Sequence, residues 1–233
     1  MPGFLYGKEC PVPHTLSFGL DVGVYGKLAT RAHILEMAML GETSGFDSLW
    51  VADHVIFPVT VTSRYPYNAS GVFPVDMSHE PLLEPIATMG VLVGATQHVR
   101  IGVAVLVMPY RNGTTRPALD RVARLGDGWI STDLQPARMA ARLDMLRGLC
   151  AANGRSFDVL SLTHKLFIDI GTAQRDKDGN RTLGTGTVAD VTDDVRRLVD
   201  FGFRNVIVRY RGGDEAQQRR QLRVFIDAIM PRF

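Results

Sequence analysis

The sequence predicts an α/β protein built on a parallel sheet with crossover helices. Three observations support this class. Short apolar stretches alternate with amphipathic ones, and Gly or polar clusters separate them. Within each apolar stretch, the apolar residues follow one another almost without interruption. Strands that are buried on both faces have this continuous pattern, because helices cover both sides of a parallel sheet. We expect six strand and helix units in regular order along the chain.

The first elements are a strand and an amphipathic helix. Residues 16–24 form a short apolar run, and residues 31–45 repeat apolar positions at helical spacing before a Gly. The run SLWVADHV, residues 48–55, is the second expected strand. A long loop follows at residues 55–79, and its aromatic residues favour a packed lid over a linker.

The middle of the chain continues the alternation. A helix is expected at 80–96, where Pro85 stands in the first turn or marks a kink. A strand rich in Val and Ile is expected at 99–110, and the third helix follows at 116–126.

The rest of the chain, from residue 127, holds three more units. The stretch LGTGT, residues 183–187, is rich in Gly but does not follow a strand directly, so we interpret it as a plain turn. The remaining expected elements are strands at 127–133, 159–171 and 203–210, and helices at 136–154, 188–202 and 214–230.

Two architectures fit such an alternation: a closed (β/α) barrel and an open doubly wound sheet. Neither G-x-G-x-x-G nor G-x-x-x-x-G-K-[ST] follows any expected strand, so the usual phosphate fingerprints of doubly wound nucleotide-binding proteins are missing. A barrel typically has eight strands in about 250 residues, whereas six strands are expected here. The pattern alone leaves the choice open.

Composition limits the possible classes of function. The chain has 233 residues, of which 45% are apolar and 21% charged, and this composition predicts one soluble domain over residues 1–233. The net charge of +2 comes from interleaved acids and bases, which argues against nucleic-acid or membrane binding. Cys10 and Cys150 lack metal or CxxC spacing and suit a reducing cytoplasm. The start of the sequence lacks the pattern of a signal peptide, and no apolar run approaches the roughly 18 residues of a membrane span.

Four stretches resemble the bacterial-luciferase-like superfamily, whose members are flavin- or deazaflavin-dependent oxidoreductases built on a (β/α) barrel. They occur in the family order and together cover 84 of the 233 residues. The stretches are GFDSLWVADHV (45–55), EPLLEPIATMGVLVGATQHVRIGVAVLVMPYRN (80–112), RPALDRVARLGDGWI (116–130) and GTVADVTDDVRRLVDFGFRNVIVRY (186–210). The resemblance implies a TIM-barrel-like fold.

The chain also departs from the family pattern. In the family, about two further βα units separate the stretches that resemble residues 80–112 and 116–130, and here only residues 113–115 lie between them. We therefore expect an internal deletion near residue 113 and an incomplete barrel of about six units. The strands at either side of the deletion either pair directly, which is the simplest repair, or leave edges that a homodimer would cover.

The resemblance gives Asp53 and His54 a catalytic role. Barrel sites lie at the carboxyl ends of the strands, where these two residues are expected, and a similar pair lies beside the cofactor ring in the deazaflavin-dependent relatives. An imidazole titrates near neutral pH, so His54 can donate or accept the substrate proton while Asp53 orients it or holds the cofactor. The alternative is that Asp53 caps the following loop and His54 is a satisfied residue at the edge of the site.

Three other residues are expected at the same end of the strands. Asp21 follows the first strand, and Val107 and Met108 follow the third, where relatives pack the cofactor ring against a strand bulge. Residues such as Val107 and Met108 are as often core as cofactor contacts.

The phosphate of the cofactor is expected at the start of the third helix. Gly113, Thr114, Thr115 and Arg116 would gather free backbone N–H groups, hydroxyls and a guanidinium there, as in the family's phosphate-holding turn. An ordinary helix cap by Thr114 or Thr115 is the alternative. Arg111 would assist with the phosphate or extend its charge into solvent.

These expectations together predict a cytoplasmic oxidoreductase or monooxygenase that uses FMN or a deazaflavin of the coenzyme F420 type on a small organic substrate. The alternative is a non-catalytic flavin-binding or structural relative, stabilised as a dimer. The sequence shows no nucleophile elbow, zinc motif or paired-carboxylate motif, so we expect no metal and no hydrolase chemistry. Five further histidines are scattered and are expected to be structural or exposed: His14, His33, His79, His98 and His164.

Overall fold

The structure is a computed structural model that describes residues 16–53, 80–104, 115–210 and 214–233. The strands are β1 (Ser17–Asp21), β2 (Ser48–Val51), β3 (Arg100–Val103), β4 (Gly128–Ser131), β5 (Ser161–Ile170), β6 (Thr185–Gly186) and β7 (Asn205–Tyr210). The α-helices are α1 (Arg31–Thr43), α2 (Pro85–Ala95), α3 (Arg116–Leu125), α4 (Pro136–Ala152), α5 (Val188–Asp200) and α6 (Glu215–Ala228). Short 3₁₀ turns lie at Gly26–Leu28, Phe157–Val159 and Met230–Arg232.

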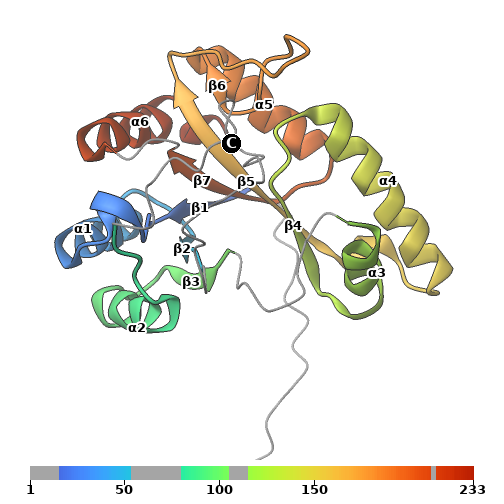
Figure 1. Cartoon of the computed structure of the whole chain (residues 1–233), viewed down its shortest axis with the longest axis horizontal. Coiled ribbons are helices and arrows are strands. Elements are labelled where there is room, and N and C mark those ends of the chain that lie inside the picture. The colour runs from blue at the N-terminus through green and yellow to red at the C-terminus, as the bar shows by residue number, and fades with distance from the viewer. Residues whose placement is uncertain (1–15, 54–79, 105–114, 211–213) are drawn as a thin grey trace, which may run out of the picture.

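All strand pairs of the sheet are parallel, in the order β3-β2-β1-β7-β5-β4, with β6 added to the end of β5. Each of the six longer strands is followed by an α-helix, and the helices lie around the outside of the strands (Figure 1). The predicted α/β class with six βα units is therefore confirmed. Within the described ranges, no helix combines the length and apolar character needed to cross a bilayer.

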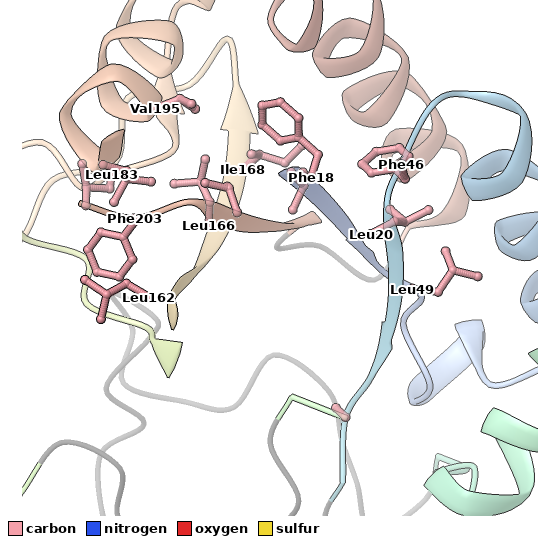
Figure 2. Close-up of a cluster of buried hydrophobic side chains, with 14 of the residues drawn as sticks. Phe18, Leu20, Phe46, Leu49, Leu162, Leu166, Ile168, Leu183, Val195 and Phe203 are labelled. Atoms are coloured by element: carbon pink, nitrogen blue, oxygen red, sulfur yellow. The ribbon is translucent and has the colours of Figure 1, made fainter. Parts of the chain in front are cut away.

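The outer face of the sheet holds the hydrophobic core. Phe18 and Leu20 alternate with Gly19 and Asp21 along β1, and the apolar pair points outward to the helices. Phe18 packs edge-to-face on Phe225 of α6, with 5.6 Å between the ring centroids. Figure 2 shows buried apolar side chains of this core from the strands, from connecting segments and from helix α5: Phe18, Leu20, Phe46, Leu49, Leu162, Leu166, Ile168, Leu183, Val195 and Phe203. Burial of each such side chain stabilises the fold by about 1.5–3 kcal/mol.

One hydrogen bond shows that the sheet is rolled. The Lys165 Nζ on β5 donates to the carbonyl oxygen of Ala104, just after β3, at 3.0 Å. Four strand spacings separate β5 from β3 in the sheet order, or about 19 Å in a flat sheet at about 4.8 Å each. That distance is several times the reach of a four-carbon side chain. The sheet therefore curls so that β3 and β5 face each other across its inner side, as in a barrel.

The two ends of the sheet are the strands that flank the expected deletion. In the part of the chain that the structure describes, β3 and β4 stand at opposite ends of the strand order and no ladder joins them. The rest of the strand expected at 99–110 lies outside the described residues, so the direct pairing expected through the short segment and the following helix α3 stays a prediction. The structure describes one chain, so the expected homodimer stays a prediction.

Two local expectations need correction. The stretch LGTGT is not a plain turn, because Thr185 and Gly186 form β6 and pair with Asp169 and Ile170 at the end of β5. The second helix begins at Pro85 rather than near residue 80, and Pro85 is a first-turn residue. The Cys150 thiol is free and buried, and Cys10 lies outside the described residues.

Candidate functional site

The candidate site lies where the carboxyl ends of the parallel strands meet, which we call the rim. β1 ends at Asp21, β2 ends two residues before Asp53, and β7 carries Arg209 one residue before its end. Parallel strands all end at the same edge, so residues from distant parts of the chain converge there. The rim is therefore where this fold places ligand-binding side chains.

A buried ionic cluster joins three strands at the rim. The Lys165 Nζ on β5 lies 2.5 Å from the Asp21 Oδ2 on β1, and the Arg209 Nη1 on β7 lies 3.4 Å from the same oxygen. The backbone N–H of Gly23 donates to the Asp21 Oδ1 at 3.1 Å. Asp21 and Lys165 are only 1% and 5% exposed. Each charge is thus paired and hydrogen-bonded, as a charge buried in a protein must be.

The cluster keeps Asp21 ionised. Burial by itself would raise the pKa of the Asp21 carboxyl, but the charges of Arg209 and Lys165, with the hydrogen bonds from Lys165 and Gly23, hold that pKa below its ordinary value. The guanidinium of Arg209 also lies over the Tyr25 ring, 4.4 Å from its centroid. Within the cluster, two cations face one carboxylate, so it carries one net positive charge.

Trp50 fills the inner face next to this cluster. A Cβ atom built on Gly19 of β1 would lie 2.5 Å from the Trp50 Nε1, and one built on Gly102 of β3 would lie 2.7 Å from its Cζ3. The Trp50 Nε1 donates to the Ser48 Oγ at 2.9 Å. The indole therefore requires glycine on both neighbouring strands. It lies against the inner face of β1 and β3.

The structure describes four of the predicted site residues. Asp21 lies in the ionic cluster, and Asp53 is buried two residues beyond β2. Thr115 is the residue before the first turn of α3, and Arg116 is the exposed first residue of that helix. The other predicted residues lie outside the described residues: His54, Val107, Met108, Arg111, Gly113 and Thr114.

The start of α3 differs from most other helix starts. Helices α2, α5 and α6 begin with a side chain that accepts from a backbone N–H of the first turn, supplied by Glu84, Thr187 and Asp214. Helices α3 and α4 have no such hydrogen bond from the residue before them and no acidic residue in the first turn. At α3 the first residue is the cationic Arg116. A cation at the positive end of a helix is suited to binding an anion there.

A cavity of about 550 Å³ opens beside the start of α4. Both signs of charge line it, including Arg138 and Arg197 as well as Asp176 and Asp178. This mixture selects no single ligand charge, so the cavity by itself does not identify a substrate.

Sequence reasoning missed Lys165 and Arg209. Both were read as parts of apolar strands, in THKLFIDIG and VIVRY. The signal was available: a charged side chain inside a strand that is buried on both faces needs a buried partner of opposite charge. The identity of that partner was not available, since Asp21 and Arg209 are 188 positions apart in the sequence.

Comparisons with known proteins agree with the fold. Residues 14–116 match the luciferase-like monooxygenase family. Among solved structures, a riboflavin lyase with modified FMN and riboflavin is similar with a TM-score of 0.65, at 11% identity, covering 93% of this chain and 91% of the lyase. A long-chain alkane monooxygenase gives a TM-score of 0.62, at 10% identity, covering 94% and 91%.

A third similar structure is an F420-dependent secondary alcohol dehydrogenase in complex with an F420-acetone adduct, with a TM-score of 0.53, at 11% identity, covering 93% of this chain and 98% of the dehydrogenase. No curated protein matches the sequence. The resemblance to the luciferase-like proteins, inferred above from four stretches of sequence, is confirmed, and the fold is that of these structures.

Proposed function

From the premise that residues 14–116 match the luciferase-like monooxygenases, we propose that this chain is an oxidoreductase that uses FMN or a deazaflavin of the F420 type. It acts at the rim on a small organic substrate, by hydride transfer or oxygenation. Neighbours in fold include proteins named for FMN and for F420 dependence, which supports either cofactor. We take residues 1–233 as one catalytic domain that works in the cytoplasm.

The observation that carries the proposal is the ionic cluster of Asp21, Lys165 and Arg209. Its net positive charge lies at the rim, where the fold places a ligand. A bound flavin or deazaflavin supplies the hydride chemistry. A buried cationic cluster close to such a ring favours negative charge on it, because the effective dielectric constant is low away from water. The donor chemistry of the described residues therefore fits an electron-accepting ring.

The start of α3 is proposed as the phosphate site. Arg116 adds a guanidinium to the positive end of the helix, and Gly113, Thr114 and Thr115 precede it in the sequence. Arg111 is proposed to assist. Backbone N–H groups, hydroxyls and a guanidinium suit a charged phosphate better than a neutral ligand.

His54 is proposed as the general acid and base. Its imidazole would hold or release the substrate proton, and Asp53, which directly precedes it, would orient the ring. Val107 and Met108 are proposed as apolar contacts to the cofactor ring. The burial of Asp53 next to the rim supports this arrangement, since a buried carboxylate has to be paired or hydrogen-bonded.

Fluorescence titration of the purified chain with FMN and with F420 tests the proposal. We expect one of them to bind at micromolar concentration and Arg116→Gln to weaken that binding about tenfold, because a charge-assisted contact to phosphate is lost. Arg124→Gln is the matched control: Arg124 lies in the last turn of the same helix, where it pairs with Asp120. Failure of both cofactors to bind at tens of micromolar would refute the proposal.

A second candidate function is a non-catalytic flavin-binding or structural relative. The observation that favours it is that the amine of Lys165 and the guanidinium of Arg209 are engaged inside the protein, while β3 and β4 stand at the two ends of the strand order among the described residues. Turnover separates the two candidates. Redox turnover of bound cofactor that His54→Ala abolishes supports the enzyme, whereas bound cofactor without turnover in either protein supports the relative.

We also propose a homodimer that covers this part of the molecule. Helix α2 precedes β3, an end strand of the sheet in the described part of the chain, and it exposes Ile86, Val91 and Val93, the first and last by more than three fifths of their surface. Exposed apolar groups next to a sheet edge are usually covered in solution. Sedimentation at micromolar concentration should show a dimer that Val93→Lys dissociates. Met39→Lys on α1, which replaces another exposed apolar residue, should leave the dimer intact.

A further inference from the structure

We propose that His33, Glu36 and Glu215 form a binding site for a divalent metal ion of the zinc type, between α1 and α6. The site shares none of its three residues with the ionic cluster or with the residues proposed above for the cofactor and for catalysis. One ligand atom of each of the three side chains lies within 4.8 Å of the other two. His33 and Glu36 are three positions apart on α1, so they share one face of that helix, and Glu215 is the first residue of α6.

The histidine is held as metal-binding histidines are. His33 is only 2% exposed, and its Nε2 lies 2.8 Å from the carbonyl oxygen of Val22. A carbonyl oxygen only accepts, so the Nε2 carries a proton, and in the singly protonated ring the Nδ1 presents its lone pair. The hydrogen bond from the Nε2 to this backbone carbonyl fixes the tautomer and orientation of the ring. Such a bond is usual for histidines whose other ring nitrogen binds a metal.

The other ring nitrogen has no hydrogen-bond partner in the described part of the chain. The Nδ1 of His33 is buried and points to the carboxylate of Glu215, whose Oε1 is 3.8 Å away. This distance is too long for a hydrogen bond, and a neutral Nδ1 and a carboxylate are both acceptors. A cation between them would satisfy both. Buried polar atoms without partners are rare in folded proteins, and an absent ion is one of their explanations.

The two carboxylates already attract a cation. The guanidinium of Arg219 lies 2.7 Å from the Glu36 Oε2 and 2.8 Å from the Glu215 Oε1. With a neutral His33, the group of Arg219 and two glutamates has one net negative charge. Arg219 is more than half exposed, so its long side chain can move into solvent when a metal ion takes its place. The positive ends of α1 and α6 oppose a cation here, but they carry partial charges against two full carboxylate charges.

The donor set selects the metal. One imidazole nitrogen and two carboxylate oxygens are ligands that Zn²⁺ accepts, and a water molecule would complete its four-coordinate shell. Ca²⁺ and Mg²⁺ prefer sites made only of oxygen atoms. Zn²⁺ and its spectroscopic substitute Co²⁺ are therefore the ions to test.

Calorimetric titration of the full chain with Zn²⁺ tests the site. We expect one ion per chain, and a loss of affinity of about tenfold or more in both His33→Gln and Glu215→Gln, because each removes a ligand. Arg219→Gln should strengthen binding, since it removes the competing cation. Glu215 is exposed, so Glu215→Gln remains informative if His33→Gln does not fold. Co²⁺ should give the absorption of a four-coordinate site, which the same two variants lose.

His98→Gln is the matched control. His98 and Glu42 form another histidine and glutamate pair, with the Nδ1 and Oε1 2.6 Å apart, but no third ligand is grouped with them in the described residues. This variant should bind Zn²⁺ as the wild type does. The proposal is overturned if the wild type does not bind Zn²⁺ at tens of micromolar, if His33→Gln and Glu215→Gln bind it unchanged, or if His98→Gln alone loses binding.

Discussion

The outer and inner faces of the sheet are stabilised by different interactions, and β5 carries both in successive residues. Leu166 points outward into the apolar core, while Lys165 points inward to Asp21 and to the carbonyl oxygen of Ala104. The apolar contacts of the outer face are non-directional, so they attach helices to the sheet without fixing its curvature. The inner contacts are directional and join β5, β1 and the end of β3. The comparison suggests that the outer face supplies stability and the inner cluster sets how far the sheet rolls.

The largest effect is expected from Asp21→Asn, which breaks the inner cluster. The substitution keeps the shape of the side chain but leaves Lys165 and Arg209 without their shared carboxylate. Removing one partner of a buried ion pair costs about 3–5 kcal/mol. Denaturant unfolding at neutral pH measures the loss. A loss below about 1 kcal/mol would mean that water reaches the cluster, and that it does not determine the curvature.

The stability at acidic pH should also distinguish Asp21→Asn from the wild type. The Asp21 pKa is lower in the folded protein than its ordinary value, so the cluster stabilises the fold above that ordinary value and loses this contribution as the pH falls toward the folded pKa. The wild type should therefore lose stability in this acidic range, and Asp21→Asn should lack this part of the dependence. Equal acid sensitivity in both proteins would contradict the assignment.

Leu166→Ala tests the outer face at the next residue of the same strand. The side chain is fully buried, and its removal leaves a cavity among outward-pointing residues that include Leu162 and Ile168. We expect a loss of about 2–5 kcal/mol in the free energy of unfolding. Unlike Asp21→Asn, this variant should keep the acid dependence of the wild type and the affinity for cofactor. A large change in cofactor affinity would show that the two faces are coupled.

A smaller effect is expected from His164→Leu, one residue before Lys165. Burial lowers the pKa of His164 from 6.5 to about 3, and the ring packs edge-to-face on Phe203. The folded protein keeps this histidine neutral, whereas the unfolded chain protonates it below about pH 6.5. Stability is therefore full above that pH and falls as the pH decreases toward about 3.

At pH 5 the neutral, buried His164 should lower the free energy of unfolding by about 2 kcal/mol. His164→Leu should remove this loss, so that the variant is more stable than the wild type at pH 5 by more than it is at pH 8. Unfolding curves at the two pH values give the comparison. A wild type and variant with parallel pH dependence would show that water reaches the His164 ring.

The elements of the outer face could be predicted from sequence because their signals are local. Apolar periodicity marked the helices, and the start of α2 was readable as well: the Glu84 carboxylate accepts from the N–H groups of Ile86 and Ala87, directly before Pro85 at the first turn. The expected start near residue 80 missed this cap. β6 could not be predicted, since two residues become a strand only by pairing with Asp169 and Ile170.

The candidate site was predictable only in part. Asp21 was expected at the rim from its place after a strand, and the structure places it there. Its partners Lys165 and Arg209 come from two later units, so their meeting depends on the strand order, in which β7 lies between β1 and β5. Whether the strands on either side of the short segment at 113–115 pair directly could not be decided from sequence, because it depends on how the whole sheet rolls.

The smallest effect on stability is expected from Gly102→Ala, which tests how tightly the side chains of the inner face are packed. A Cβ atom at this position would lie 2.7 Å from the Cζ3 and 2.9 Å from the Cε3 of Trp50, closer than real contacts allow. Overpacking of this kind costs about 1–3 kcal/mol. Trp50→Phe removes the crowded part of the indole, so the double variant should recover part of the loss. A double-mutant cycle isolates this coupling, because the two residues are neighbours on β2 and β3. Additive effects of the two substitutions would mean that the indole moves aside freely, and that the inner face next to the ionic cluster is loosely packed.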